Sequence, residues 1–162
     1  FLIFLNYKML YWIFDLDYTL YNLDKSLPFE YNKLHKDSIL DNYLKLLPSE
    51  KIIFTNGTHE HGIRCLNKMV IKDNFKNIVA RDTINDLKPN IISYIKMMFL
   101  CDIEHKDKCV FFEDSISNLI VAKKLGWITV LISKFPINHT SIDFCFPNIH
   151  YALGYFLSKI FK

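Results

Sequence analysis

The chain has 162 residues and a net charge of +3, and 51% of its residues are hydrophobic. A chain of this length can bury a sizeable core in one domain, and its apolar content excludes an intrinsically disordered protein. With only 4 Gly and 5 Pro, long flexible linkers are not expected. The lysines are spread along the chain, so specific nucleic-acid binding is not expected, whereas a small anionic substrate fits the charge.

The cysteines indicate a reducing compartment. They form no CxxC pair and have no histidine at zinc-finger spacing, which predicts reduced core thiols in a cytoplasmic or nucleoplasmic protein: Cys65, Cys101, Cys109 and Cys145. The apolar start, residues 1–5, lacks the basic residues and cleavage site of a secretory signal and is too short to cross a membrane. Two interpretations of residues 1–8 stay open, a native segment or an upstream extension before Met9.

In chain order, the first predicted element is a buried strand over residues 11–15, an apolar run that ends in acids. Residues 28–47 have apolar positions at roughly helical spacing and are followed by Pro48, which predicts one or two helices. A second strand covers residues 51–54. Thr58 then caps a helix that runs to about Met69.

The second half of the chain continues this alternation. Its predicted elements are strands over 77–80, 109–112, 127–132 and 144–146, and helices over 89–100, 116–125 and 149–160. Pro89 fits the first turn of its helix, Ser115 caps the next one, and Gly126 ends it. Strands separated by helices predict a parallel sheet with right-handed crossovers in a single α/β domain over residues 1–162.

Polar residues follow the predicted strands where a ligand site is expected. They are Asp15 and Asp17 after the first strand, Thr55 and Asn56 after the second, Lys88 at the head of a helix, and Glu113 and Asp114 after the fourth strand. Parallel α/β sheets bind ligands outside the carboxyl ends of their strands. Carboxylates can hold magnesium, while a lysine, a hydroxyl and amides can hold phosphate oxygens. This set predicts a magnesium-dependent phosphoryl-transfer site.

These residues resemble the motifs of the haloacid dehalogenase (HAD) superfamily of aspartate-nucleophile phosphohydrolases. The four motifs stand in order as Asp15-Leu16-Asp17-Tyr18-Thr19, Thr55, Lys88-Pro89 and Glu113-Asp114-Ser115, and the resemblance runs from Tyr11 to about Ile132. It implies a Rossmann-like, three-layer α/β/α fold around a central parallel sheet. The amino-acid sequences of residues 54–57, 61–66 and 113–118 most resemble the pyrimidine 5′-nucleotidase branch of this superfamily.

The resemblance also implies roles for individual residues. Asp15 would be the nucleophile that forms an aspartyl-phosphate, and Asp17 would be the general acid and base. Mg²⁺ would be held by Asp15, by the backbone carbonyl of Asp17 and by Asp114, with Glu113 supporting it through water.

By the same resemblance, Thr55, a backbone amide of Asn56 and Lys88 would bind the substrate phosphate, and Lys88 would also neutralise Asp15. Other polar residues near these motifs are expected to have ordinary structural roles. We expect His59 and His61 to face solvent on the first turn of their helix.

The segment after the first motif departs from the nucleotidase pattern, which has a large helical cap there. Only residues 21–50 separate the motif from the second strand, which predicts a reduced helical cap. Caps exclude water and select the leaving group. Either the site is open to a bulkier substrate, such as a phosphoprotein or a nucleic-acid end, or another subunit of a homo-oligomer covers it.

Several functions stay open at this point. The first is a magnesium-dependent phosphatase that acts on a small phosphomonoester such as a nucleotide. The alternatives are an open-site phosphatase that acts on a macromolecule, and a catalytically silent HAD-like binding protein. A phosphomutase would use the same core. Asp17 argues against dehalogenation, which needs no such acid beside the nucleophile.

Overall fold

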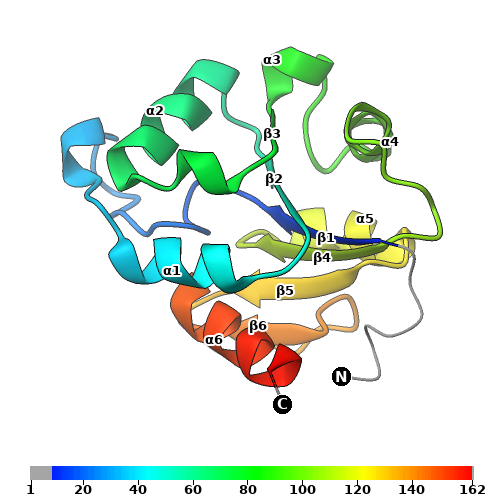
Figure 1. Ribbon diagram of the computed structural model, residues 1–162. Helices are drawn as coiled ribbons and strands as arrows, with labels where there is room; N and C mark the ends of the chain where they lie inside the picture. The colour runs from blue at the N-terminus through cyan, green and yellow to red at the C-terminus, as the bar shows by residue number, and fades with distance from the viewer. Residues whose placement is uncertain (1–8, 162) are drawn as a thin grey trace.

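A six-stranded parallel sheet runs through the middle of the protein, as the computed structural model of residues 9–161 shows (Figure 1). The strands are β1 (Leu10–Phe14), β2 (Glu50–Phe54), β3 (Asn77–Val79), β4 (Lys108–Glu113), β5 (Ile128–Ile132) and β6 (Phe144–Phe146). Their order in the sheet is β3-β2-β1-β4-β5-β6. The parallel sheet and the Rossmann-like fold predicted from the sequence are therefore confirmed. The interpretations of residues 1–8 lie outside the described residues.

Strand β1 occupies the middle of the sheet and pairs with β2 on one side and β4 on the other. Ile13 lies opposite Ile52 in β2 and Phe111 in β4. Because successive side chains of a strand point to opposite faces, Trp12 and Phe14 enter one half of the core and Ile13 enters the other. Both faces are covered by helices, which explains why β1 is apolar without alternation.

The helices form two layers. One face of the sheet is covered by α1 (Ser38–Leu46), α2 (His59–Met69) and α6 (Ile149–Ile160), and the other by α3 (Arg81–Ile84), α4 (Ile91–Leu100) and α5 (Ile116–Lys124). Two short 3₁₀ turns, η1 (Tyr31–Lys33) and η2 (Lys72–Asn74), complete the elements. Leu40, Leu66 and Leu153 are fully buried in the first layer, and Tyr94 and Leu119 in the second.

Apart from the 28–47 segment, the bounds of most predicted strands and helices agree with the structure to within one or two residues. The capping residues of the helices can be compared one by one. Thr58 caps α2 through its side chain, as predicted. Pro89 lies before α4, whose N-cap is Asn90, so the prediction that Pro89 starts the helix is wrong. Ser115 stands at the N-cap of α5 without a capping hydrogen bond, and its hydroxyl lies 2.9 Å from that of Ser117.

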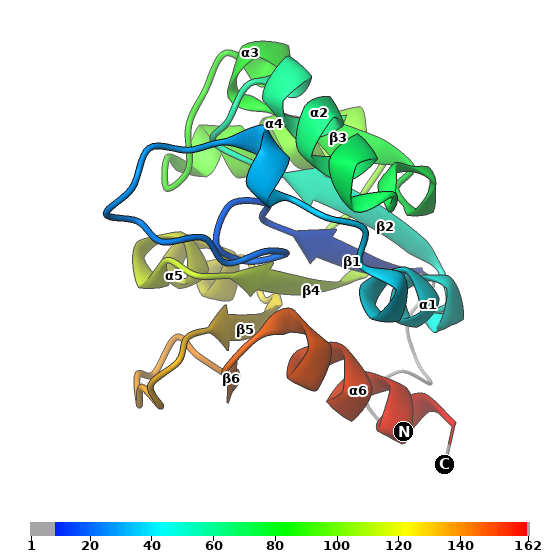
Figure 2. The same ribbon diagram turned by 90° about the vertical axis from the view of Figure 1, so that its left-hand side faces the viewer.

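The predicted cap over residues 21–50 divides into two parts. Helix α1 belongs to the layer on the sheet, beside α6, because Leu40 and Leu44 share one helix face and are fully buried. Residues 21–37 lie across the carboxyl ends of the strands and contain only the turn η1 (Figure 2). The segment over the strand ends is therefore shorter than the sequence prediction of a helical cap.

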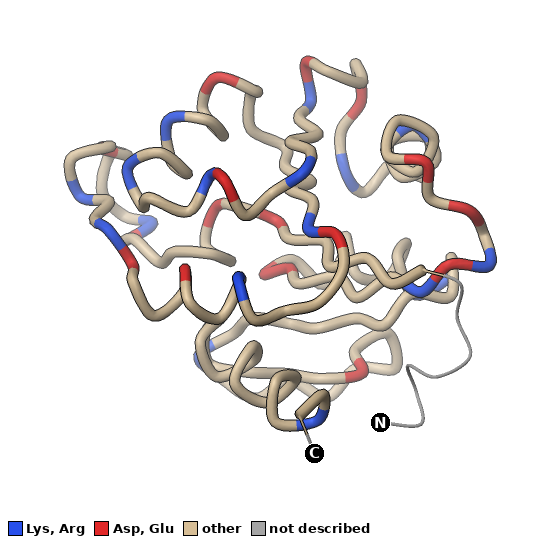
Figure 3. The backbone as a smooth tube through the Cα atoms, in the orientation of Figure 1, with Lys and Arg blue, Asp and Glu red and all other residues tan. Residues whose placement is uncertain are grey.

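The positive charges are spread along the chain and the cysteines are unpaired, as the sequence predicts. Lysine and arginine are distributed over helices and loops instead of forming one stretch (Figure 3). All four cysteines are free, and Cys65, Cys101 and Cys109 are buried. Between residues 9 and 161, no helix is long and apolar enough to cross a membrane.

Candidate active site

Asp15 is fixed directly after β1. Its backbone N–H donates to the Phe112 carbonyl at 2.9 Å, which continues the pairing of β1 with β4. One carboxylate oxygen, Oδ1, accepts a hydrogen bond from Lys88 Nζ at 2.8 Å, and the other accepts one from the Thr19 hydroxyl at 3.2 Å. Burial raises the pKa of Asp15, although the Lys88 charge opposes this rise. The carboxylate is thus buried, oriented and paired with a cation.

The Lys88 side chain is fully buried and hydrogen-bonds residues in β2 and β4 and the residue that follows β1. Its three N–H donors go to Asp15, to the Phe54 carbonyl at 2.7 Å and to Glu113 Oε2 at 2.8 Å. The Asn56 side chain holds the Lys88 backbone, since it accepts from Lys88 N at 2.8 Å and donates to Lys88 O at 2.9 Å. Burial alone would lower the pKa of Lys88, but the two carboxylates raise it overall. Lys88 therefore stays charged.

Glu113 organises the turn after β4. Its Oε1 accepts from the backbone amides of the next two residues at 3.0 Å, and its Oε2 accepts from Lys88 and from Asn118 Nδ2 at 2.9 Å. Burial and then the charge of Asp15 raise the pKa of Glu113 to about 8. The structure therefore gives Glu113 the role of holding Lys88 and the turn. Its support of a metal through water stays a prediction.

A cluster of carboxylates could hold a metal ion. Oxygens of Asp15, Glu113 and Asp114 all lie within 4.8 Å of one another. Asp114 Oδ2 also accepts a hydrogen bond from Lys25 Nζ at 2.9 Å. The Asp17 carboxylate is outside this cluster, which is consistent with a role for its backbone carbonyl alone. Carboxylate oxygens are the ligands that Mg²⁺ prefers in proteins, so the donor set fits this ion.

The Asp17 carboxylate lies in a separate hydrogen-bond network. Its Oδ1 accepts from the Tyr21 hydroxyl and lies 2.8 Å from His61 Nε2, and Tyr31 lies 2.9 Å from His61 Nδ1. Burial would raise the pKa of Asp17, but hydrogen bonds from His61 and Tyr21 lower it overall. Hydrogen bonds to Asp17 and then to Cys65 raise the pKa of His61 to about 11. The network therefore favours a carboxylate beside an imidazolium.

The expectation that His61 faces solvent is wrong, because its side chain is only 19% exposed and contacts Asp17. The sequence carried one usable signal. Thr58 caps α2, and the first turn of a helix that follows a strand lies at the carboxyl edge of a parallel sheet. A residue three positions after the cap can therefore reach the site. Tyr21, four residues after Asp17, also donates a hydrogen bond to it.

The phosphate-binding candidates lie at the same edge. Thr55 is buried, and its hydroxyl accepts from Gly57 N at 3.0 Å, which leaves its own hydrogen for donation. A Cβ on Gly57 would lie 3.3 Å from Thr55 Oγ1, 3.6 Å from Asp17 Oδ2 and 2.9 Å from His61 Cδ2. The Asn56 side chain is engaged with Lys88, so only its backbone amide remains for a ligand. Glycine is thus required where these groups converge.

The structure brings together the residues that the sequence placed at the site. Two clusters result: the buried carboxylates with Lys88, and Asp17 with its partners beside Thr55. Asn118, His61 and Tyr21 are the additions that the structure makes. A nucleophilic carboxylate, a cation, an oxygen-donor metal site and an adjoining acid or base are the groups that phosphoryl transfer through a covalent intermediate requires.

Comparison with known families gives one match over more than half of the chain. The family model of haloacid dehalogenase-like hydrolases matches residues 40–132. This range contains Thr55, Lys88, Glu113 and Asp114, and it begins after Asp15 and Asp17.

Solved structures with a similar fold include enzymes of more than one activity. An L-2-haloacid dehalogenase from Xanthobacter autotrophicus has a TM-score of 0.62 at 16% identity, over 80% of this chain and 62% of that one. A HAD phosphatase from Thermococcus onnurineus has a TM-score of 0.58 at 22% identity, over 72% and 54%. A HAD-family protein from Bacillus subtilis bound to magnesium has a TM-score of 0.62 at 13% identity, over 75% and 55%. The chain thus spans about three fifths or less of these proteins.

Proposed function

The chain belongs to the haloacid dehalogenase-like hydrolases, and within this family we propose that it is a magnesium-dependent phosphomonoester hydrolase. The observation that carries the proposal is the placement of Asp17, a second carboxylate two residues after the nucleophile, held by His61 and Tyr21 outside the metal-binding cluster. A carboxylate at this position can exchange protons with a leaving oxygen and with water. Dehalogenation needs no such group beside the nucleophile.

In the first step, a carboxylate oxygen of Asp15 attacks phosphorus and the bond to the leaving oxygen breaks. Asp15 becomes an aspartyl-phosphate, and the leaving oxygen takes a proton from Asp17. Lys88 offsets the negative charge around Asp15 throughout. Because its three donors already have acceptors in the protein, we propose that Lys88 acts on the phosphate mainly through its charge.

In the second step, Asp17 takes a proton from water as the water attacks phosphorus and regenerates Asp15. The hydrogen bonds from His61 and Tyr21 favour the carboxylate form that this step needs. For the first step Asp17 must carry a proton, and His61 Nε2 lies 2.8 Å from Asp17 Oδ1. We propose that a protonated His61 supplies this proton and takes it back after the second step.

Asp15, Asp114 and the Asp17 backbone carbonyl would hold the magnesium ion, with Glu113 fixed beside them by its own hydrogen bonds. When bound, the ion neutralises the charge of the phosphoryl oxygens and orients them toward the nucleophile. Thr55 and the Asn56 amide would contact the other phosphate oxygens. Nucleoside monophosphates are the substrates that we propose first, because of the resemblance to the nucleotidase branch, and a cytoplasmic location remains part of the proposal.

The test is hydrolysis of a panel of phosphomonoesters with Mg²⁺ by the wild type, Asp15→Asn and Asp73→Asn. The panel contains p-nitrophenyl phosphate, nucleoside monophosphates and a phosphopeptide, and chloride release from 2-chloropropionate is measured in parallel. We expect wild-type phosphate release to fall by about a thousandfold or more in Asp15→Asn. Asp73 is exposed on η2, so Asp73→Asn is the matched control and should keep full activity.

Other outcomes of this hydrolysis test would support one of the alternative functions. Release from the phosphopeptide alone would support the open-site phosphatase. Chloride release without phosphate release would identify a dehalogenase and overturn the proposal. A folded wild type that leaves every substrate intact would favour a silent binding protein, and activity that survives in Asp15→Asn would remove Asp15 as the nucleophile.

A further inference from the structure

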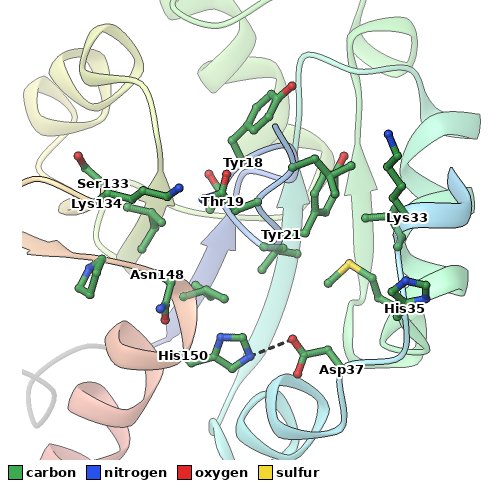
Figure 4. Close-up of a pocket in the computed structure, with 18 residues that line it drawn as sticks. Tyr18, Thr19, Tyr21, Lys33, His35, Asp37, Ser133, Lys134, Asn148 and His150 are labelled. Carbon is green, nitrogen blue, oxygen red and sulfur yellow. Dashed lines mark hydrogen bonds and ion pairs between the residues drawn. The ribbon is translucent and has the colours of Figure 1, made fainter. Parts of the chain in front are cut away.

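A half-open cavity of about 530 Å³ adjoins the turn that follows β1 (Figure 4). It lies between residues 18–23, residues 33–37, the end of β5 and the start of α6. Among the described residues that line it, none belongs to the phosphate-binding candidates Thr55, Asn56 and Lys88. The cavity is therefore a space beside the candidate phosphate site and not a part of it.

The cavity and the active site share a wall. Thr19 and Tyr21 line the cavity, and the same two side chains hydrogen-bond Asp15 and Asp17. Tyr18, between them in the sequence, also lines it and has a φ of 64°, a left-handed conformation that is uncommon outside glycine. A molecule in the cavity would contact the turn that holds both carboxylates.

The inner surface of the cavity is apolar. Leu20, Leu34 and Met69 line it and are each no more than 5% exposed. Buried leucine and methionine side chains form a surface on which a flat apolar group can pack. A ring system is thus the kind of group that fits this surface.

The rim of the cavity is cationic. Lys33 and Lys134 stand on opposite sides of it in Figure 4. Asp37 is the single acidic residue among the described residues of the lining, and it pairs with His150 at 2.9 Å. Lys33 pairs with Glu30 at the surface, where both side chains are at least 40% exposed, and such a pair exchanges easily.

Lys134 connects this cavity with the acidic cluster. A second cavity of about 730 Å³ is lined by Asp114 and Lys25, and it shares Tyr18 and Lys134 with the first. Among residues 9–161, no ion pair at 4 Å or less involves Lys134, although its charge acts on Asp24, which also lines the second cavity, whereas Lys25 contacts Asp114. Lys134 is therefore a cation available to a ligand in either cavity.

We propose that the first cavity binds an organic anion with an apolar ring system. The ring packs on Leu20, Leu34 and Met69, and the anionic group pairs with Lys134 and Lys33. The volume lies within the range of small-molecule sites. Such an anion has two sources: the leaving group of a substrate that extends through the second cavity, or a separate molecule that acts through the turn of Thr19 and Tyr21.

The test is a titration of the full chain with 8-anilinonaphthalene-1-sulfonate, an aromatic anion, followed by fluorescence and by ¹H–¹⁵N NMR. We expect the amide signals of Leu20, Ser133 and Ile149 to shift. The double variant Lys33→Glu/Lys134→Glu should bind at least about tenfold more weakly, because two attractive contacts become repulsive. Lys36→Glu/Lys124→Glu is the control, since it has the same net charge and changes exposed lysines that do not line the cavity.

Equal affinities of the two double variants would overturn the proposal, as would amide shifts confined to the exposed face of α4 or the absence of binding. Steady-state hydrolysis of p-nitrophenyl phosphate in the presence of the probe separates the two sources. Competitive inhibition indicates the leaving-group space, and a change in kcat at saturating substrate indicates a separate effector. If no hydrolysis is seen, the proposed function fails while the binding result still stands.

Discussion

Two lysines at the candidate site, Lys88 and Lys25, differ in burial and therefore in how much their ion pairs contribute to stability. The side chain of Lys88 is fully buried between Asp15 and Glu113, and that of Lys25 is 64% exposed while it contacts Asp114. Removing a buried partner leaves an uncompensated charge and costs about 3–5 kcal/mol, whereas an exposed ion pair contributes about 0–1 kcal/mol. Lys88 is therefore a fixed part of the site, and Lys25 is exchangeable.

In the proposed magnesium site, Lys25 would compete with the metal for the Asp114 carboxylate. Lys25→Ala is expected to bind Mg²⁺ up to about fivefold more tightly at low ionic strength, because the metal no longer displaces an ammonium group. Isothermal titration calorimetry measures this change, which should shrink at high salt. Lys36→Ala, on the same exposed segment, should match the wild type. Weaker magnesium binding by Lys25→Ala would show that Lys25 supports the site.

At the level of elements, the site depends on the close approach of the β2–α2 connection to the turn after β1. Gly57 lies at this contact, where a Cβ would come within 2.9 Å of His61. The ring of His61 is held by Asp17 and Tyr31, so it cannot move without loosening the Asp17 carboxylate. The packing of two elements therefore sets the position of the Asp17 carboxylate.

Gly57→Ala is expected to lower kcat by about tenfold or more, with a smaller effect on KM, because it displaces His61 and crowds Asp17. Steady-state kinetics and thermal unfolding measure the two effects. Gly154→Ala in α6 is the matched control: its Cβ would meet only the Tyr43 hydroxyl, at an ordinary 3.9 Å, and the change should stabilise the helix by about 0.5–1 kcal/mol. Normal kinetics in Gly57→Ala would mean that His61 does not position Asp17.

The elements were easier to predict than the contacts between them. The strands over 51–54 and 144–146 and the cap at Thr58 followed from local apolar runs and side-chain chemistry. The contact of His61 with Asp17 joins residues 44 positions apart, and the cap at Thr58 places His61 near this edge of the sheet without naming its partner. The apolar spacing over residues 28–47 predicted one or two helices, but only the burial of Leu40 and Leu44 shows that α1 packs on the sheet.

For the whole molecule, the buried carboxylates make stability depend on pH. The pKa of Glu113 is about 8 in the folded chain against an ordinary value of 4.5, and burial also raises the pKa of Asp15. At pH values between 4.5 and about 8, the folded state binds more protons than the unfolded state, so the free energy of unfolding falls as the pH rises. His61, with a raised pKa, acts in the same direction above pH 6.5.

Without metal, the free energy of unfolding in urea is therefore expected to fall by about 2 kcal/mol between pH 5.0 and 6.5 for one proton of difference. Glu113→Gln should flatten this slope, since it removes the titrating group. Saturating Mg²⁺ should restore stability at pH 8.5, because the ion favours the carboxylate forms. Stability that stays level or rises over this pH range would show that Glu113 is ionised in the folded state at pH 5.

The position of β1 between β2 and β4 has a consequence for how the chain comes apart. The carboxylates that would share magnesium come from Asp15 and Asp114, which follow the neighbouring strands β1 and β4 and are roughly a hundred positions apart along the backbone. An ion bound as proposed would therefore act as a removable crosslink that closes a long loop. It would couple the first strand to the second half of the chain, so that opening of β1 from β4 would require release of the metal.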